Sequence, residues 1–205
     1  MKYYLMINDK NWKKPLLSDL ERFMINSKDY DVPSNSKILK YSLFSSSFRA
    51  IFFYRLSQHK FFVKRKSFLQ LLTIIASLLN EVVIYPTVQI KGGLFIGHPK
   101  CIVIHPKSRL GKNVTILQGV TIGGNIGKKR HGRLSPEIED NVLIGAGAKV
   151  LGPIVIGENS MIGANAVVTK DVPKNSVVIG IPAKVIKTVT KPYIEIENEY
   201  YSKTG

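Results

Sequence analysis

Two histidines lie close together in this sequence, His98 directly after Gly97 and His105 directly before Pro106. Histidine gains and loses a proton near neutral pH, so it can take the proton from a hydroxyl that attacks an activated ester. We therefore expect His98 to act as a general base. His105 could orient His98, bind the acceptor or be the base itself, and the sequence leaves these three roles open beside a fourth alternative, a corner residue before Pro106 with no role.

A metal site is not expected from the same residues. His98 and His105 are seven positions apart, and no cysteine and histidine spacing typical of zinc is present. Cys101 is the only cysteine, which excludes a disulfide within the chain and fits a reducing compartment. We expect a cytoplasmic protein without a metal.

The element that must position these histidines is a six-residue repeat. From Ile138 to Val168 every sixth residue is a branched aliphatic, and the same period runs back through Ile122 to Ile104 and from Ile102 to Ile84. An α-helix has 3.6 residues per turn and a strand alternates with period two, so neither explains this spacing. A short fixed period predicts a solenoid of triangular coils, mainly β, in which each hexapeptide forms one side.

The repeat is interrupted at two places. It slips by two residues between Ile102 and Ile104, beside His98, and sixteen residues separate Ile122 from Ile138. Insertions in solenoids map to loops, often on the binding face. The longer interruption contains the basic stretch 128–133, which could attract an anionic glycan or border a cofactor.

The sequence divides into three expected parts: an N-terminal helical region at 1–80, the β-helix at 81–187 and a C-terminal tail at 188–205. Within the first part we expect helices capped by Ser18 and by Ser47 and an amphipathic helix at 67–80. That last helix could cover the end of the solenoid or another subunit. Together with basic residues 60–66, the segment 60–80 could also contact the membrane surface.

The net charge of +16 permits nucleic-acid, lipid or polyanion binding. No nucleic-acid-binding motif accompanies the charge, so we expect no nucleic-acid partner.

Several motifs in order make residues 45–187 resemble the hexapeptide-repeat acyltransferases, which have a left-handed parallel β-helix, and within them the serine acetyltransferase-like branch. The matching segments are 93–106, 119–124, 144–152, 162–173 and 180–186. The resemblance implies an acetyl-CoA-dependent O-acetyltransferase with acetyl-CoA in the groove between adjacent coils, assembled as a homotrimer or a dimer of trimers.

The resemblance also implies the residues that contact the cofactor. Backbone groups of Ala146 and Ala164 would lie against acetyl-CoA, and Gly124 would donate an N–H near the thioester. Thr169 and Lys170 would hold the far end of the cofactor, and Lys187 would lie near its phosphates.

Four positions depart from the serine acetyltransferase pattern. Gly97 and Val83 replace two aspartates, and Leu134 and Ser135 replace the Arg-His pair that binds the amino acid's carboxylate. Because recognition groups cannot be lost without losing specificity, we predict a different acceptor. The expected acceptor is a saccharide hydroxyl in the synthesis of capsule or O-antigen polysaccharide, which is the branch that the His-Pro motifs resemble.

For this saccharide acceptor the expected substrate-binding residues are Arg130, His131 and Arg133. Two alternatives remain open at this point. One is a serine O-acetyltransferase of cysteine biosynthesis, and the other is a non-catalytic trimeric scaffold held at the inner face of the membrane through residues 60–80.

Overall fold

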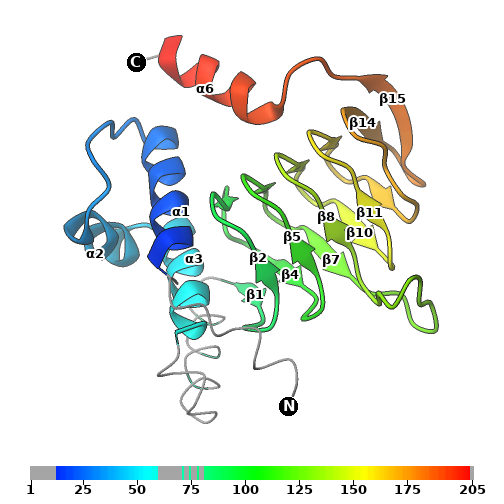
Figure 1. The fold of residues 1–205 in the computed structure, drawn as a ribbon, viewed down its shortest axis with the longest axis horizontal. Coiled ribbons are helices and arrows are strands. Elements are labelled where there is room, and N and C mark those ends of the chain that lie inside the picture. Colours follow the sequence, from blue (N-terminus) through cyan, green and yellow to red (C-terminus); the bar gives the residue numbers. More distant parts are fainter. Residues whose placement is uncertain (1–12, 60–70, 72–73, 75–77, 79–80, 204–205) are drawn as a thin grey trace.

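The computed structural model describes residues 13–59, 71, 74, 78 and 81–203 of the chain (Figure 1). Of the helices whose bounds the described residues give, three come before the β-solenoid and one follows it. The helices are α1 (Lys13–Asn26), α2 (Asn35–Phe44), α3 (Ser46–Ser57) and α6 (Tyr193–Lys203). The expected fold class, mainly β with an N-terminal helical region, is therefore confirmed.

Strands of the solenoid form three sheets, one on each side of the triangular coil, here named sheets A, B and C. Sheet A contains β1 (Val82–Ile84), β4 (Ile102–Ile104), β7 (Thr121–Gly123), β10 (Lys149–Leu151) and β13 (Val167–Val168). Sheet B contains β2 (Gln89–Ile90), β5 (Arg109–Leu110), β8 (Glu137–Ile138) and β11 (Val155–Ile156). Sheet C contains β3 (Phe95–Ile96), β6 (Thr115–Ile116), β9 (Leu143–Ile144), β12 (Met161–Ile162), β14 (Ser176–Ile179) and β15 (Lys184–Thr188).

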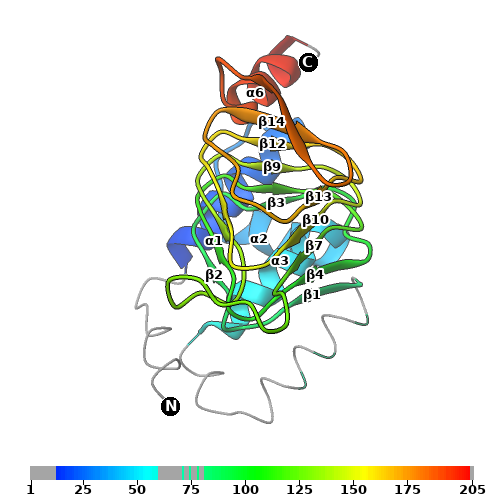
Figure 2. The same cartoon turned by 90° about the vertical axis from the view of Figure 1, so that its right-hand side faces the viewer.

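All neighbouring strands are parallel except β15, which runs antiparallel to β14. Figure 2 shows β1, β4, β7, β10 and β13 stacked in that order, one strand per coil. The sheet A registers pair Ile84 with Ile104 and Ile104 with Ile122, so the repeat aliphatics stack in columns inside the solenoid. These stacked coils are those expected of a left-handed β-helix of hexapeptide repeats.

The core consists of the aliphatic residues of the six-residue repeat. Ile96, Ile104, Ile116 and Ile122 are fully buried, and burying such a side chain stabilises the fold by about 1.5–3 kcal/mol. Ile102 is also fully buried, because it and Ile104 are the two inward residues of the same strand. The two extra residues of the slip therefore belong to the corner at 97–101.

Asparagines form a ladder along the corner between sheets B and C. Asn113, Asn141, Asn159 and Asn175 all have left-handed backbone conformations with φ between 54° and 59°, which asparagine tolerates better than most residues. Each side-chain amide donates to the next asparagine along the ladder, at 3.0, 3.1 and 2.9 Å. The ladder fixes this corner of four successive turns.

The N-terminal helices begin at different residues from those expected. Ser18 lies inside α1, which starts at Lys13 and carries Pro15 in its first turn, a favourable place for proline. Ser45, not Ser47, caps α3, accepting a hydrogen bond from the Phe48 N–H at 3.3 Å. Helix α2 was not predicted, because its apolar residues Leu39 and Phe44 are exposed and form no buried stripe.

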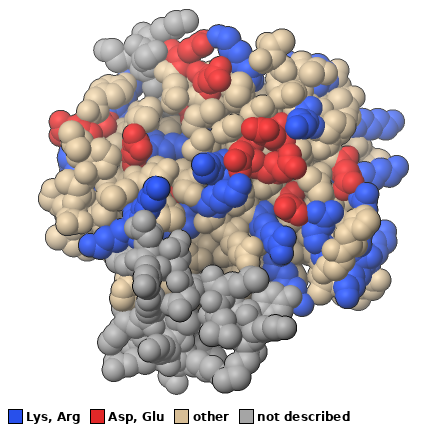
Figure 3. Space-filling model, in the orientation of Figure 1, with Lys and Arg blue, Asp and Glu red and all other residues tan. Residues whose placement is uncertain are grey.

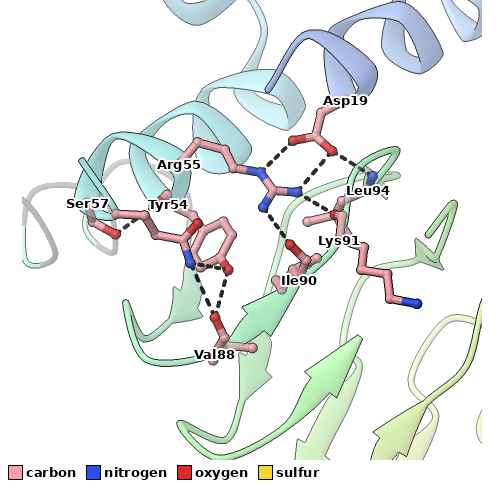
Figure 4. Close-up of polar contacts among 9 residues, drawn as sticks. Asp19, Tyr54, Arg55, Ser57, Val88, Ile90, Lys91 and Leu94 are labelled. Atoms are coloured by element: carbon pink, nitrogen blue, oxygen red, sulfur yellow. Dashed lines mark hydrogen bonds and ion pairs between the residues drawn. The ribbon is translucent and has the colours of Figure 1, made fainter. Parts of the chain in front are cut away.

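A buried ion pair joins the helices to the first coil (Figure 4). Arg55 of α3 donates from Nε to Asp19 Oδ2 of α1 at 2.7 Å, and from Nη1 to the Ile90 carbonyl at 2.7 Å. Asp19 Oδ1 in turn accepts the Leu94 N–H at 2.8 Å. Both charged side chains are at most 1% exposed. Helices α1 and α3 are therefore fixed to the backbone of Ile90 and Leu94, which flank the segment that leads to β3.

A second buried ion pair fixes the C-terminal segment. Helix α6, in the segment expected as a tail, returns from β15 toward α1 (Figure 1). Its Glu197 accepts from Arg22 Nη2 at 2.9 Å, with side-chain exposures of 3% and 5%. Arg22 also donates to the Gly93 carbonyl at 2.9 Å. The C-terminal helix thus joins the first coil and α1.

Replacing Glu197 by alanine is expected to lower the free energy of unfolding by about 3 kcal/mol, because the Arg22 cation would stay buried without its carboxylate. Chemical denaturation at fixed protein concentration measures the change. Glu199→Gln is the matched control on the same helix, since Glu199 pairs with Lys191 at an exposed site and should cost less than about 1 kcal/mol. Equal effects of the two substitutions would contradict the structural role of Glu197.

Most of the expected membrane-contact segment, residues 60–80, lies outside the described residues. Leu71, Ile74 and Leu78 are described there, and all three are helical and exposed. Among the residues that the structure describes, no helix is both long enough and apolar enough to cross a bilayer. Surface contact with a membrane stays a prediction.

Candidate active site

His98 lies at the corner between sheets C and A, directly after β3 and Gly97. Its backbone is left-handed, with φ of 54°, and a tight turn follows in which the Lys100 N–H donates to the His98 carbonyl at 2.7 Å. The side chain is exposed. Within the described part of the chain no side chain or backbone group hydrogen-bonds its imidazole, so the ring is available to a substrate.

The groups that could orient His98 are otherwise occupied or absent. Glu81, one candidate, accepts from Lys100 Nζ at 2.6 Å. Gly97 packs so closely on the next coil that a Cβ there would lie 2.8 Å from Leu117 Cδ2. A side chain at position 97 would therefore require the end of the Leu117 side chain to move.

His105 lies at the opposite edge of sheet A, after β4. Four residues of chain run from Cys101 to His105, about 13 Å when extended, so within one chain His105 is too far from His98 to orient it. The Lys107 N–H donates to His105 Nδ1 at 3.2 Å. The neutral ring therefore carries its proton on Nε2, which is a hydrogen-bond donor and not a base.

The surroundings of His105 favour this neutral form. Burial, and secondly the charge of Lys107, lower the pKa of His105. Nε2 faces Gly124 of the next coil, where an added Cβ would lie 3.6 Å from Nε2 and 2.9 Å from the Leu134 carbonyl oxygen. Of the three roles that the sequence left open for His105, this geometry favours binding through Nε2–H.

Ala146 and Ala164 lie on the same corner as His98, between sheets C and A. The Gly119, Gly147 and Asn165 N–H groups donate to the Lys100, Gln118 and Ala146 carbonyls at 2.8, 2.7 and 2.8 Å, which stacks the four successive turns of this corner. Gly145, beside Ala146, has no room for a side chain, because a Cβ would lie 2.7 Å from the Ala164 nitrogen. Ala146 and Ala164 thus place small side chains at this corner on the second and third coils after His98, whereas Gln118 stands there on the coil directly after it.

The other expected cofactor residues lie elsewhere. Gly124, Thr169 and Lys170 follow strands β7 and β13 and share the corner between sheets A and B with His105. Lys187 lies on β15, opposite Val177 of β14, and is exposed. The structure thus groups His98 with Ala146 and Ala164, and groups His105 with Gly124, Thr169 and Lys170, on opposite edges of sheet A.

Residues 124–136, here named the insertion loop, leave this second corner after β7. A four-residue turn closes the loop, with Arg130 and Arg133 exchanging backbone hydrogen bonds at 3.1 and 2.9 Å. His131 and Gly132 at its centre have φ of 49° and 77°. The pattern is that of a turn with two left-handed central residues, and it leaves His131 exposed.

Both arginines expected to bind an acceptor are paired with carboxylates of the chain. Arg130 Nη1 lies 2.5 Å from Asp171 Oδ2, and Arg133 Nη1 lies 2.6 Å from Glu137 Oε2. Asp171 Oδ1 also accepts the Val155 N–H at 2.9 Å. Sequence reasoning did not identify either carboxylate, although Glu137 lies only four residues after Arg133. Asp171 is 41 residues from Arg130, and nothing in the local sequence indicates that the loop reaches it.

No cluster of three or more possible metal ligands occurs within the described residues. The expectation that the protein uses no metal stays a prediction.

Comparison with known proteins agrees with this architecture. Residues 135–170 match the family described as bacterial transferase hexapeptide (six repeats). A serine acetyltransferase of Staphylococcus xylosus is 48% identical over 130 residues, which cover 63% of this chain and 59% of the relative. A serine acetyltransferase of Bacillus licheniformis is 37% identical over 169 residues, covering 80% of this chain and 77% of the relative.

A solved structure is similarly close. Serine acetyltransferase of Brucella abortus in complex with coenzyme A superimposes with a TM-score of 0.73 and 34% identity, covering 92% of this chain and 72% of that one. Fold and repeats define a hexapeptide-repeat transferase. Within that class, the chain belongs to the serine acetyltransferase family.

This membership corrects the predicted acceptor. The sequence was interpreted as a polysaccharide O-acetyltransferase of the capsule or O-antigen type, and that prediction is wrong, because the relatives matched are serine acetyltransferases. The prediction relied on four positions, 83, 97, 134 and 135. At one of them, Gly97, a side chain would contact Leu117 of the next coil.

Proposed function

We propose that this chain is an acetyl-CoA-dependent O-acetyltransferase whose acceptor is the hydroxyl of serine, with His98 as the general base. The observation that carries the proposal is the corner between sheets C and A, where an imidazole without a hydrogen-bond partner among the described residues stands in line with Ala146 and Ala164. Membership of the serine acetyltransferase family supports both the donor and the acceptor.

The dimensions of this corner suit an extended thioester. Successive coils are about 4.8 Å apart, so Ala146 and Ala164 lie two and three coils from His98, or roughly 10 and 14 Å away along the corner. Small side chains at both positions would let a linear ligand approach the backbone. Its acyl end would then lie beside the His98 ring.

The reaction requires one proton transfer and one acyl transfer. His98 takes the proton of the serine hydroxyl while the oxygen attacks the thioester carbonyl, the C–S bond breaks, and His98 returns the proton to the departing thiolate. Backbone N–H groups, with Gly124 as a candidate, would stabilise the oxyanion. We propose direct transfer without a covalent enzyme intermediate.

A homotrimer would complete the site. His98 is on one edge of sheet A, whereas Gly124 and His105 are on the other. Threefold rotation about an axis parallel to the solenoid would bring one edge of each copy beside the other edge of the next. Each of three sites would then combine His98 of one copy with Gly124 and His105 of a second.

The acceptor must be held by groups other than those of the usual pattern. Positions 83, 97, 134 and 135 lack the residues that the resemblance assigns to serine recognition. The Nε2–H of His105 is one donor available beside Gly124 for an acceptor oxygen. We further propose a cytoplasmic location, as the single cysteine suggests.

The proposal is tested by following thiol release from acetyl-CoA with L-serine as acceptor. We expect saturable, serine-dependent release and O-acetylserine as the product by mass spectrometry. Glycine, which lacks the hydroxyl, is the matched control and should give only the background rate. If acetyl-CoA binds but serine adds nothing to the background rate, serine is not the acceptor, and if acetyl-CoA does not bind, the transferase assignment fails altogether.

A further inference from the structure

A column of side chains follows the corner between sheets C and A, on the edge that carries His98. The strand registers place above one another the residues that stand two positions after the buried isoleucine of each coil. In coil order these residues are His98, Gln118, Ala146 and Ala164. Gln118 therefore stands between the candidate base and the small residues along which the acetyl donor is proposed to lie.

The backbone on both sides of Gln118 is fixed by the neighbouring coils. The Gln118 carbonyl accepts the Gly147 N–H at 2.7 Å. The next residue, Gly119, donates its N–H to the Lys100 carbonyl at 2.8 Å and accepts from Lys149 Nζ at 2.6 Å. The point from which the Gln118 side chain leaves the corner is thus set by the coil below and the coil above.

The Gln118 side chain itself is exposed and makes no hydrogen bond to any residue that the structure describes. A primary amide has two N–H donors and one acceptor oxygen. A glutamine side chain is comparable in length to the coil spacing of about 4.8 Å, so the amide can reach a ligand atom that lies beside the His98 ring. Position 118 thus combines a fixed backbone with a free donor next to the candidate base.

This column is also uncharged above His98. Figure 3 shows Asp and Glu side chains gathered among Lys and Arg on one face of the molecule, whereas Gln118, Ala146 and Ala164 carry no charge. A neutral donor suits the carbonyl oxygen of a thioester, because that oxygen is neutral in the bound substrate and becomes negative only when a hydroxyl oxygen attacks.

We propose that the Gln118 amide donates a hydrogen bond to the carbonyl oxygen of the thioester and stabilises the negative charge that this oxygen gains during acyl transfer. The charge develops as the acceptor oxygen bonds to the carbonyl carbon, and it leaves the oxygen when the C–S bond breaks. Gln118 is then a catalytic residue on the same chain as His98. The inference rests on the proposed function for the acetyl donor, but it does not depend on which hydroxyl is the acceptor.

The geometry favours the carbonyl over the other groups that this amide could bind. The reacting carbon must lie about 3–3.5 Å from the hydroxyl oxygen that His98 deprotonates. A donor that follows the column from Ala164 and Ala146 reaches that point only by passing position 118. Orientation of His98 would instead require the Gln118 oxygen to accept from the imidazole, and these two side chains are not hydrogen-bonded to each other.

The first experiment compares Gln118→Ala with Gln118→Glu. Both substitutions remove the N–H donor, whereas glutamate keeps an acceptor oxygen and adds a negative charge beside the developing oxyanion. We expect Gln118→Ala to lower kcat about 10²-fold, as for the loss of one oxyanion donor, and Gln118→Glu to lower it at least as far. By calorimetry, the Kd of Gln118→Ala for coenzyme A should equal that of the wild type.

Gln89→Ala is the matched control, because Gln89 is an exposed glutamine on β2 of sheet B, away from this corner. It should keep the wild-type kcat and the wild-type Kd for coenzyme A. A loss of rate confined to position 118 can then be assigned to the place of the amide and not to the loss of a surface glutamine.

The second experiment needs no acceptor. Infrared difference spectra of bound acetyl-CoA, isotopically labelled at its carbonyl carbon, report hydrogen bonding to the carbonyl, because a donated hydrogen bond weakens the C=O bond and lowers its stretching frequency. We expect a lower frequency in the wild type than in Gln118→Ala and Gln118→Glu. Gln89→Ala should show the wild-type frequency.

The outcomes separate this inference from the proposed function. A carbonyl frequency that depends on Gln118, without serine-dependent thiol release, would support the contact and show that serine is not the acceptor. Serine acetylation and a carbonyl frequency that are unchanged in both variants would overturn the inference and leave the proposed function standing. Activity kept in Gln118→Glu but lost in Gln118→Ala would assign the amide to the orientation of His98, and a raised KM for serine at unchanged kcat would assign it to the acceptor. Either result would also overturn the inference.

Discussion

Replacing His98 by asparagine is expected to lower kcat by about 10²- to 10⁴-fold, the usual contribution of a positioned general base. Asparagine is preferred to alanine because position 98 has φ of 54°. An alanine in this left-handed conformation costs roughly 1–2 kcal/mol, whereas asparagine already occupies such positions in the ladder at 113, 141, 159 and 175. The loss of rate can then be assigned to the imidazole and not to the turn.

Thiol release under saturating acetyl-CoA and serine measures the effect, and calorimetry should find coenzyme A binding unchanged. The matched control is Cys101→Asn, in the same corner, exposed, and with φ of 53°. Because direct transfer needs no thiol, this variant should keep wild-type turnover. Turnover that survives in His98→Asn would remove His98 from the mechanism, and turnover lost in Cys101→Asn would indicate an acyl-enzyme intermediate.

The solenoid could be predicted from the sequence because its core residues recur at a fixed interval along the chain. Each coil contributes an aliphatic at the same sixth position, and Ile104 and Ile122 stack because they are in register in neighbouring strands. The asparagine ladder was equally accessible, since Asn113, Asn141 and Asn159 each stand three residues after a buried aliphatic of sheet B. We did not recognise that second period, although left-handed corners favour asparagine.

Two ion pairs of the structure could not be predicted, because their partners are distant in sequence. Arg130 and Asp171 are 41 residues apart, and Arg22 and Glu197 are 175 apart. An unpaired arginine in a basic loop is typical of a substrate-binding group, so Arg130 was predicted as one. The protonation of His105 depends instead on a group nearby in sequence, the Lys107 N–H two residues on, whose direction follows from the turn and not from residue types.

The acceptor was mispredicted for a related reason. The prediction of a saccharide acceptor gave four substituted positions more weight than the rest of the chain. The chain is 37% identical to the Bacillus licheniformis relative over 169 residues. Similarity along most of the chain is stronger evidence for the family than the residues at those four positions. The groups that hold the acceptor must then be sought on both edges of sheet A and not only at those four positions.

Replacing Asp19 by asparagine is expected to lower the free energy of unfolding by about 3–5 kcal/mol, the largest stability effect that we predict. The substitution preserves shape but leaves the Arg55 guanidinium, 1% exposed, without a counter-charge (Figure 4). Burial, although opposed by Arg55, raises the pKa of Asp19. The aspartate is thus stabilised as an anion mainly by its partner, and the two must be tested together.

A double-mutant cycle separates the pair from its surroundings. Arg55→Met alone leaves Asp19 buried and unpaired, whereas Asp19→Asn combined with Arg55→Met removes both charges. The double variant should therefore lose less stability than the sum of the two single variants, by more than about 1 kcal/mol. The comparison pair is Lys91 with Asp140, where Lys91→Gln should cost less than about 1 kcal/mol because that lysine is 61% exposed.

Activity provides the second measurement of this pair. Asp19 Oδ1 holds the Leu94 N–H four residues before His98, so a loosened pair would disturb the corner that presents the base. In Asp19→Asn we expect kcat to drop further below the wild-type value as the temperature rises. At low temperature, where the variant stays folded, its kcat should approach that of the wild type. Additive stability losses around the cycle would show that Asp19 and Arg55 act independently. A kcat that stayed low at every temperature would indicate that Asp19 takes part in the reaction and does not only support the corner that carries His98.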